Sequence, residues 1–165
     1  MLKPIINAIR YSIYFSILIY SIIVFSIFVL PLFKLNPLSI NNNNMMPDFK
    51  KGSLVLLVNT DPTEIYIDDI ISYTNNIEPY NYDTNRVVEK KIDDRNFIVK
   101  GDNKTEKNDE PVSYISTLGK VIYNIPYLGY INNFITQPLG KIISTIAIFT
   151  LLVVPYLLKF LIEDK

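Results

Sequence analysis

The run GSLVLLV at residues 52–58 is the clearest indication of the fold of this chain. Its apolar part is short, is rich in Leu and Val, and lies between Lys-Gly-Ser and Asn-Thr-Asp-Pro. This pattern is typical of a buried β-strand. Four more short runs rich in Val, Ile or Tyr follow it: DIISY at 69–73, RVVE at 86–89, FIVK at 97–100 and GKVIYN at 119–124. Turn-forming residues separate these runs. Residues 34–130 are therefore expected to fold as a small, mostly β domain, either a barrel or a sandwich.

A long apolar stretch precedes this region. Residues 11–33 carry no charge, and a helix of roughly 23 residues can cross about 30 Å of hydrocarbon. A cleaved signal peptide is the competing interpretation, because Lys3 and Arg10 give the stretch a charged start. Signal peptides have an apolar core of about 7–15 residues and a small-residue cleavage site, whereas this run is longer and ends at Lys34. Residues 1–33 are therefore expected to form a short cytoplasmic tail and an uncleaved transmembrane anchor.

A second apolar stretch lies near the carboxyl end. Residues 142–158 are uncharged, and the stretch extends to Ile162 if Lys159 snorkels to the membrane surface. A buried amphipathic helix is the alternative, but this run is apolar on all sides. The sequence therefore predicts a second transmembrane helix at residues 142–162, after a connector at 131–141 and before a tail at 163–165. Two spans would leave both termini on the same side of the membrane.

Composition narrows the possible functions. Hydrophobic residues make up 49% of the 165 residues, and the mean hydropathy is +0.22, which favours an integral membrane protein. Sixteen basic residues balance sixteen acidic ones, so no overall field indicates nucleic acid. The chain has no cysteine and no histidine, which excludes disulfides and thiolate sites and removes the commonest general base and metal ligand. No cofactor and no metal site are expected.

Six short motifs occur in order between residues 42 and 129. They read NNNMMP at 42–47, GSLVLLV at 52–58, DDIISY at 68–73, TNRVVE at 84–89, KGDN at 100–103 and GKVIYNIPYLG at 119–129. Their order resembles that of the type I signal peptidase family, in particular its archaeal and endoplasmic-reticulum members. The resemblance implies a signal-peptidase-like β domain on the extracytoplasmic side of the membrane, and a serine endopeptidase that processes signal peptides during protein secretion.

The chain departs from the family pattern at the positions that carry out catalysis in the family. The resemblance places the nucleophilic serine at Asn44, the basic histidine at Asn85 and the serine that supports the oxyanion at Asn42. It assigns the acid to Asp102 or Asp109. Two further members of the NNNMMP motif, Met45 and Pro47, are expected to border the peptide-binding site.

Asparagine cannot replace either missing catalytic group. The side-chain nitrogen of Asn44 is part of an amide and is a poor nucleophile, and Asn85 does not titrate near neutral pH. Arg86, next to the base position, stays protonated and cannot accept a proton. The run of four asparagines at 41–44 is interpreted as a low-complexity loop that has drifted in sequence.

Three hypotheses follow for the function. The first is an inactive homologue, a pseudoenzyme, that binds exported preproteins or an active signal peptidase. The second is an active signal peptidase of unfamiliar chemistry, and the third is a paralogue without a specific task. The motif order further predicts that Asn44, Asn85 and either Asp102 or Asp109 converge on one cleft.

Overall fold

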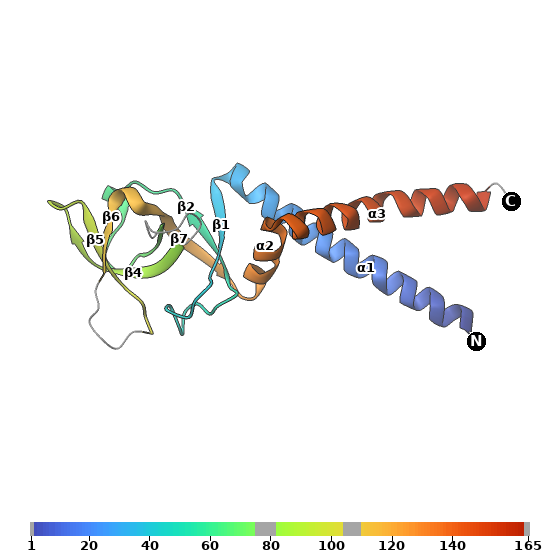
Figure 1. Cartoon of the computed structure of the whole chain (residues 1–165), viewed down its shortest axis with the longest axis horizontal. Helices are drawn as coiled ribbons and strands as arrows, with labels where there is room; N and C mark the ends of the chain where they lie inside the picture. The colour runs from blue at the N-terminus through green and yellow to red at the C-terminus, as the bar shows by residue number, and fades with distance from the viewer. Residues whose placement is uncertain (1, 75–81, 104–109, 164–165) are drawn as a thin grey trace. The chain divides into compact units, whose positions relative to one another are not determined.

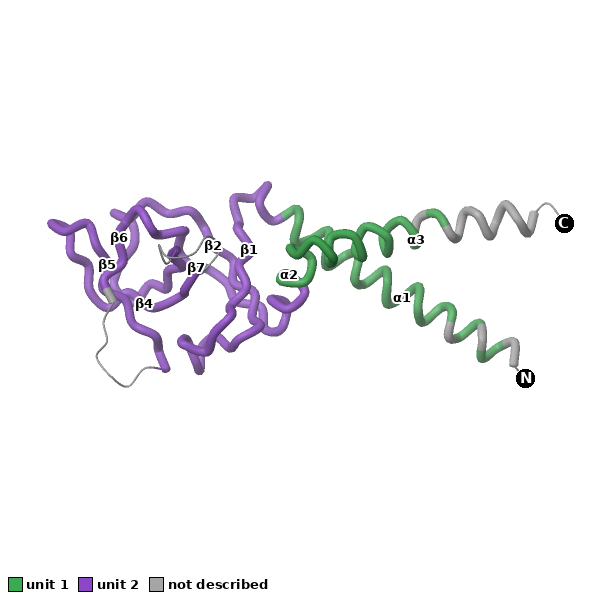
Figure 2. Tube along the Cα trace, viewed as in Figure 1, with its two compact units in different colours: residues 1–29, 133–165 green, residues 30–132 purple. Residues whose placement is uncertain are grey.

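A computed structural model describes residues 2–74, 82–103 and 110–163 of the chain (Figure 1). The chain divides into two compact units, shown in Figure 2. One consists of residues 1–29 and 133–165, which are mostly helical. The other consists of residues 30–132 and contains the β structure.

A single antiparallel sheet of seven strands forms the second unit and curls into a half-barrel (Figure 1). The strands lie in the order β1-β2-β7-β3-β4-β5-β6. Their bounds are β1 Leu35–Ser39, β2 Leu54–Val58, β3 Ile70–Thr74, β4 Tyr82–Lys91, β5 Asn96–Lys100, β6 Glu110–Ser113 and β7 Thr117–Ile125. Single turns of 3-10 helix lie at η1 Leu30–Phe33, η2 Pro62–Glu64 and η3 Tyr114–Ser116. The expectation of a mostly β domain is confirmed.

Two apolar clusters stabilise the sheet. One fills the part built from β3 to β6, and its fully buried members include Ile71, Val87 and Phe97. The other gathers Ile40, Met45, Phe49, Val55 and Leu57 beside β2. Strand β2 is buried on both faces, which explains why its sequence is apolar throughout rather than alternating.

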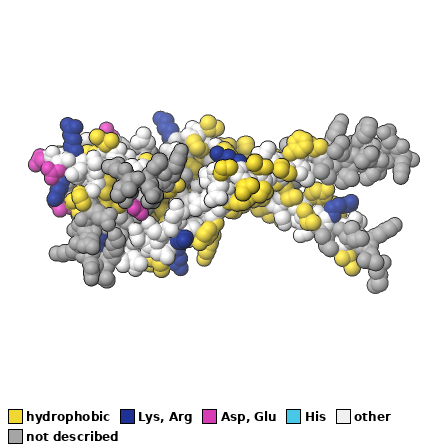
Figure 3. Space-filling view, viewed as in Figure 1, with side chains coloured by type: hydrophobic (Ala, Val, Ile, Leu, Met, Phe, Trp, Pro, Cys, Tyr) yellow, Lys and Arg dark blue, Asp and Glu magenta, His cyan; other side chains and the backbone are white. Residues whose placement is uncertain are grey.

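The helical unit contains α1 Leu2–Val29 and α3 Pro138–Glu163, and the helix α2 Leu128–Thr136 runs from one unit into the other. The stretch Arg10–Phe33 has a mean hydropathy of 2.6 and is long enough to cross a membrane. Exposed apolar side chains gather along α1 and the beginning of α3, whereas charged ones gather mostly over the sheet (Figure 3). An N-terminal membrane helix is therefore supported by length and composition.

The carboxyl-terminal span remains a prediction. Helix α3 is 26 residues long, but the apolar part that the structure describes, Pro138–Thr150, is shorter than a span. The predicted connector at 131–141 is largely helical, because α2 covers 128–136. This helix was not apparent from the sequence, since it has only 9 residues and buries only a narrow stripe that includes Asn132 and Ile135.

Candidate functional site

Asparagine side chains shape the loop after β1. The Asn42 amide donates a hydrogen bond of 2.8 Å to the Asp83 carboxylate on β4, and its oxygen accepts one of 3.2 Å from the backbone N–H of Asn44. The side-chain oxygen of Asn43 accepts a hydrogen bond of 2.9 Å from the Lys51 N–H. The side chains of Asn42 and Asn43 thus have defined partners in the fold.

The backbone of Asn44 packs against the turn after β5. Its carbonyl accepts a hydrogen bond of 2.9 Å from the Asn103 N–H. A Cβ atom on Gly101 would lie 2.7 Å from that carbonyl oxygen and 3.2 Å from the Asn44 Cβ, so only glycine fits there without a shift. The loop motif and the KGDN motif, which are far apart in sequence, therefore meet through their backbones.

Met45 and Pro47, the two residues of the NNNMMP motif that are expected to border the peptide-binding site, differ in exposure. Met45 is fully buried in the cluster beside β2, where it acts as a core residue and not as a surface contact. Pro47 is exposed, and a cis peptide bond precedes it. Of this pair, Pro47 alone is available to a ligand in this structure.

Asn85 occupies a buried position on β4 with only 2% of its surface exposed. Its amide nitrogen donates a hydrogen bond of 2.7 Å to the Tyr73 hydroxyl on β3. Its side-chain oxygen has no hydrogen-bond partner among the described residues. Asn85 pairs with Ile71 across the ladder, so its amide lies at the margin of the apolar cluster.

Arg86, the next residue, binds Asp102 in a two-pronged ion pair. Its Nε donates to Asp102 Oδ1 at 2.9 Å, and its Nη2 donates to Asp102 Oδ2 at 2.7 Å. Nη2 also donates to Asp48 Oδ2 at 2.7 Å, and Nη1 donates to the Asp68 carbonyl at 3.0 Å. The hydrogen bonds that Arg86 donates to Asp102 raise the pKa of Arg86; burial opposes this shift, and the charges of Asp102 and Asp48 add to it.

We call Arg86, Asp102, Asp48 and Asp68 the arginine clamp. It joins the loop after Pro47 to β4 and to the turn after β5. Both carboxylate oxygens of Asp102 are bound to Arg86, so this acid candidate already has a cationic partner. Asp109, the other candidate, lies outside the described residues.

Alternation along β4 separates these groups. Successive strand residues point to opposite faces, so Arg86 and its bound Asp102 lie on the face opposite to Asn85. Asp83, which binds Asn42, shares the face of Asn85. The loop thus reaches both faces of β4. The convergence of the Asn44 and Asn85 side chains on one cleft stays a prediction.

The serines that flank the loop between β1 and β2, Ser39 and Ser53, are buried. Ser39 is 1% exposed; its hydroxyl donates to the Gly129 carbonyl at 3.0 Å and accepts from the Asn132 amide at 2.8 Å. Ser53 is 2% exposed. Within the described residues, no group of three His, Cys, Asp or Glu side chains could hold a metal ion.

Sequence reasoning missed Tyr73 and Asp48. Tyr73 is 12 residues from Asn85, and Asp48 is 38 residues from Arg86, so nothing local in the sequence indicates these pairs. Comparison with known families and with curated proteins gives no match for this chain.

Proposed function

We propose that this chain is a catalytically degenerate member of the type I signal peptidase family that binds exported peptides or an active peptidase and does not cleave. The single observation that carries the proposal is the state of the two key positions. Asn44 holds the turn after β5 through its carbonyl, and Asn85 is buried and bonded to Tyr73. Asn85 is therefore a buried amide of the sheet, and Asn44 contributes its backbone to the contact between the loop and the turn.

The fold is compatible with this membership. Six motifs occur in the family's order, and the chain has a curled antiparallel sheet after an apolar N-terminal helix. Acyl transfer by this route needs an oxygen nucleophile and a base within hydrogen-bond reach of it. Loss of one member of such a set already costs several orders of magnitude in rate. Peptide binding needs neither group.

Strand β1 is the proposed site of peptide binding. In the described sheet it pairs with β2 on one side and stands at the edge on the other, and it leads directly into the loop that contains Asn44. An extended peptide can add to such an edge through backbone hydrogen bonds. Asn36 is exposed, whereas Ser39 is buried, so the first part of the strand is the accessible part.

Photo-cross-linking tests this site. The full-length protein would carry benzoylphenylalanine in place of Asn36, and in the control in place of Ile92, which is 72% exposed in the turn between β4 and β5. Both are irradiated with a preprotein that has an intact signal peptide. We expect an adduct from the Asn36 position only. Equal adducts from both positions, or none from Asn36, would contradict peptide binding at β1.

We further propose two membrane spans, with both termini cytoplasmic and the sheet unit extracytoplasmic. Reporter fusions after Lys165 and after Ile92 test this topology. The expected result is that the two fusions report opposite sides. Reporters on the same side would overturn it.

A further inference from the structure

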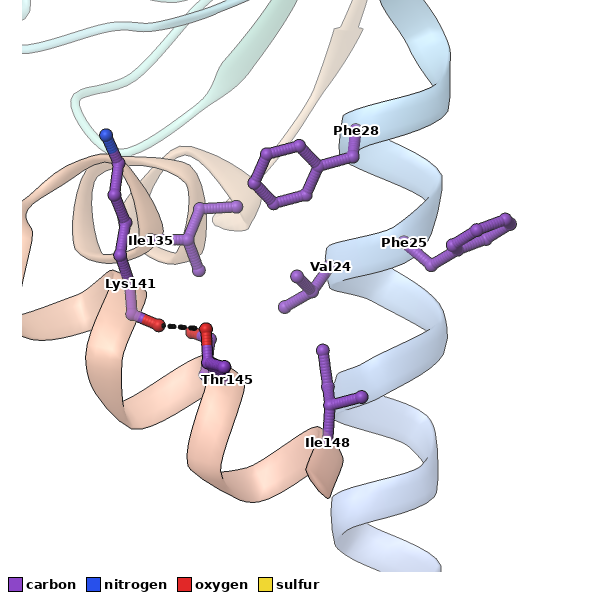
Figure 4. Close-up of a pocket in the computed structure, with 8 residues that line it drawn as sticks. Val24, Phe25, Phe28, Ile135, Lys141, Thr145 and Ile148 are labelled. Carbon is purple, nitrogen blue, oxygen red and sulfur yellow. Dashed lines mark hydrogen bonds between the residues drawn. The ribbon is translucent and has the colours of Figure 1, made fainter. Parts of the chain in front are cut away.

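A cavity of about 500 Å³ lies within the helical unit, between α1 and the beginning of α3 (Figure 4). Val24 and Phe28 line it from α1, Ile135 from the end of α2 and Ile148 from α3. Val24 is 2% exposed and Ile135 is 3% exposed, whereas Phe28 is 62% exposed, so the cavity has a buried floor and is open at Phe28. The interior surface is largely hydrocarbon.

The hydroxyl groups that border the cavity already have partners. Ser144 donates to the Gly140 carbonyl at 2.6 Å, and its oxygen lies 2.7 Å from the Tyr20 hydroxyl. Thr145 donates to the Lys141 carbonyl at 2.9 Å, as Figure 4 shows. A ligand with polar groups along its length would leave them unsatisfied inside the cavity. The part of a ligand that enters must therefore be apolar.

Lys141 is the charged residue that lines the cavity. It is exposed, and its ammonium group points away from the apolar side chains that line the cavity (Figure 4). The methylene groups of such a lysine contact apolar surface while its ammonium group stays outside the cavity. The ammonium group can then bind an anion at the cavity entrance. The cavity thus combines an apolar interior with one positive charge at its edge.

The hydrocarbon lining and the bonded hydroxyl groups favour a thin apolar occupant. A hydrocarbon chain is much thinner than a helix and has no polar backbone. Val24 lies nine residues before Phe33, or about 14 Å along the helix from the end of the apolar stretch, which is within reach of an acyl chain from the headgroup region.

We propose that this cavity binds one acyl chain of an anionic phospholipid and that Lys141 holds the phosphate of its headgroup. The proposal rests on the membrane anchoring in the proposed function.

Fluorescence quenching tests the site, because the chain contains no tryptophan. The full-length Phe28→Trp variant places a reporter at the cavity, and Phe15→Trp places a matched control on the same helix away from it, since the native side chains are 62% and 63% exposed. Each variant in detergent micelles is titrated with brominated phosphatidylglycerol or brominated phosphatidylcholine. For Phe28→Trp we expect half-quenching at about a fivefold lower fraction of the anionic lipid, the factor for one lysine at a charged surface. For Phe15→Trp the two lipids should quench equally.

A second substitution separates the headgroup contact from general lipid contact. Adding Lys141→Gln to Phe28→Trp should remove the preference for the anionic lipid. Glycerophosphate, which has no acyl chains, should not relieve the quenching. Equal preference at both reporter positions, or a preference that survives Lys141→Gln, would overturn the lipid site. Quenching of Phe15→Trp alone, together with a dimeric mass, would assign the cavity to a second copy and also overturn it. Absence of quenching at both positions would instead overturn the membrane anchoring.

Discussion

Polar side chains on the two faces of strand β4 differ in how completely they are hydrogen-bonded. On one face, Arg86 uses three nitrogens to bind Asp102, Asp48 and the Asp68 carbonyl. On the other face, Asn85 makes one hydrogen bond to Tyr73 and leaves its oxygen without a partner among the described residues. All three nitrogens of the Arg86 guanidinium therefore have partners, whereas Asn85 has a partner only for its nitrogen.

This difference indicates that the hydrogen bonds of Arg86 stabilise the fold more than those of Asn85 do. A buried polar group without a partner costs about 1–3 kcal/mol, so it persists where other demands outweigh stability. Asn85 occupies the position that the resemblance assigns to a catalytic base, and its environment is poorly matched to an amide. The arginine clamp, by contrast, binds the former acid candidate Asp102 as a structural partner.

The largest effect is expected from the arginine clamp. Arg86→Ala removes all hydrogen bonds of the guanidinium. It also leaves the carboxylates of Asp48 and Asp102 without the cation that they share. We expect the free energy of unfolding to fall by about 2 kcal/mol, a value reduced because the Arg86 side chain is 27% exposed. Urea unfolding of the full-length protein in detergent, followed by circular dichroism, measures this change.

Lys120→Ala is the matched control for the clamp. It breaks one ion pair, between Lys120 and Asp69 at 2.7 Å on the same sheet. The expected loss is below about 1 kcal/mol. Equal losses for the two variants would show that the clamp is an ordinary surface pair.

An intermediate effect is expected at the contact between the loop and the turn after β5. Gly101→Ala places a methyl group 2.7 Å from the Asn44 carbonyl oxygen and forces the two segments apart. We expect a loss of about 1.5 kcal/mol in the same unfolding measurement. Asn103→Ala, which keeps the backbone donor to Asn44, should change stability little. Comparable stability of Gly101→Ala and the unmodified protein would contradict the close approach.

The smallest effect is expected on the opposite face of β4. The double variant Asn85→Leu with Tyr73→Phe removes both hydrogen-bonding partners together. The change in unfolding free energy should stay within about 1 kcal/mol, in either direction, because two apolar groups replace an incompletely satisfied pair. A loss of unfolding free energy as large as that of Arg86→Ala would mean that Asn85 and Tyr73 stabilise the sheet as much as the arginine clamp does.

The sequence predicted five of the seven strands, since β2, β3, β4, β5 and β7 all contain short runs rich in Val, Ile, Leu or Tyr. It missed β1, whose sequence LNPLS contains asparagine and proline, and β6, which is four residues long and contains Pro111. Both are edge strands, where proline is tolerated and pairing depends on the neighbouring strand. Local composition therefore predicts the middle of this sheet better than its edges.

The candidate site was less predictable than the fold. The motif order indicated Asn42, Asn44, Asn85 and Asp102 as site residues. The backbone contact between the loop after β1 and the turn after β5 is an observation that the structure adds. The partner of each side chain was not predictable. The hydrogen bond between Asn42 and Asp83 spans 41 residues, and such pairs follow from strand order and register.

Cleavage of a preprotein is the most direct test of the central claim that this chain is a pseudoenzyme. The detergent-purified full-length protein is incubated with a preprotein that an active archaeal-type signal peptidase cleaves, and the products are separated on a gel. We predict that the preprotein remains intact in the presence of this protein while the active enzyme processes it. Product formed at a comparable rate, and abolished by Asn44→Ala, would contradict the claim.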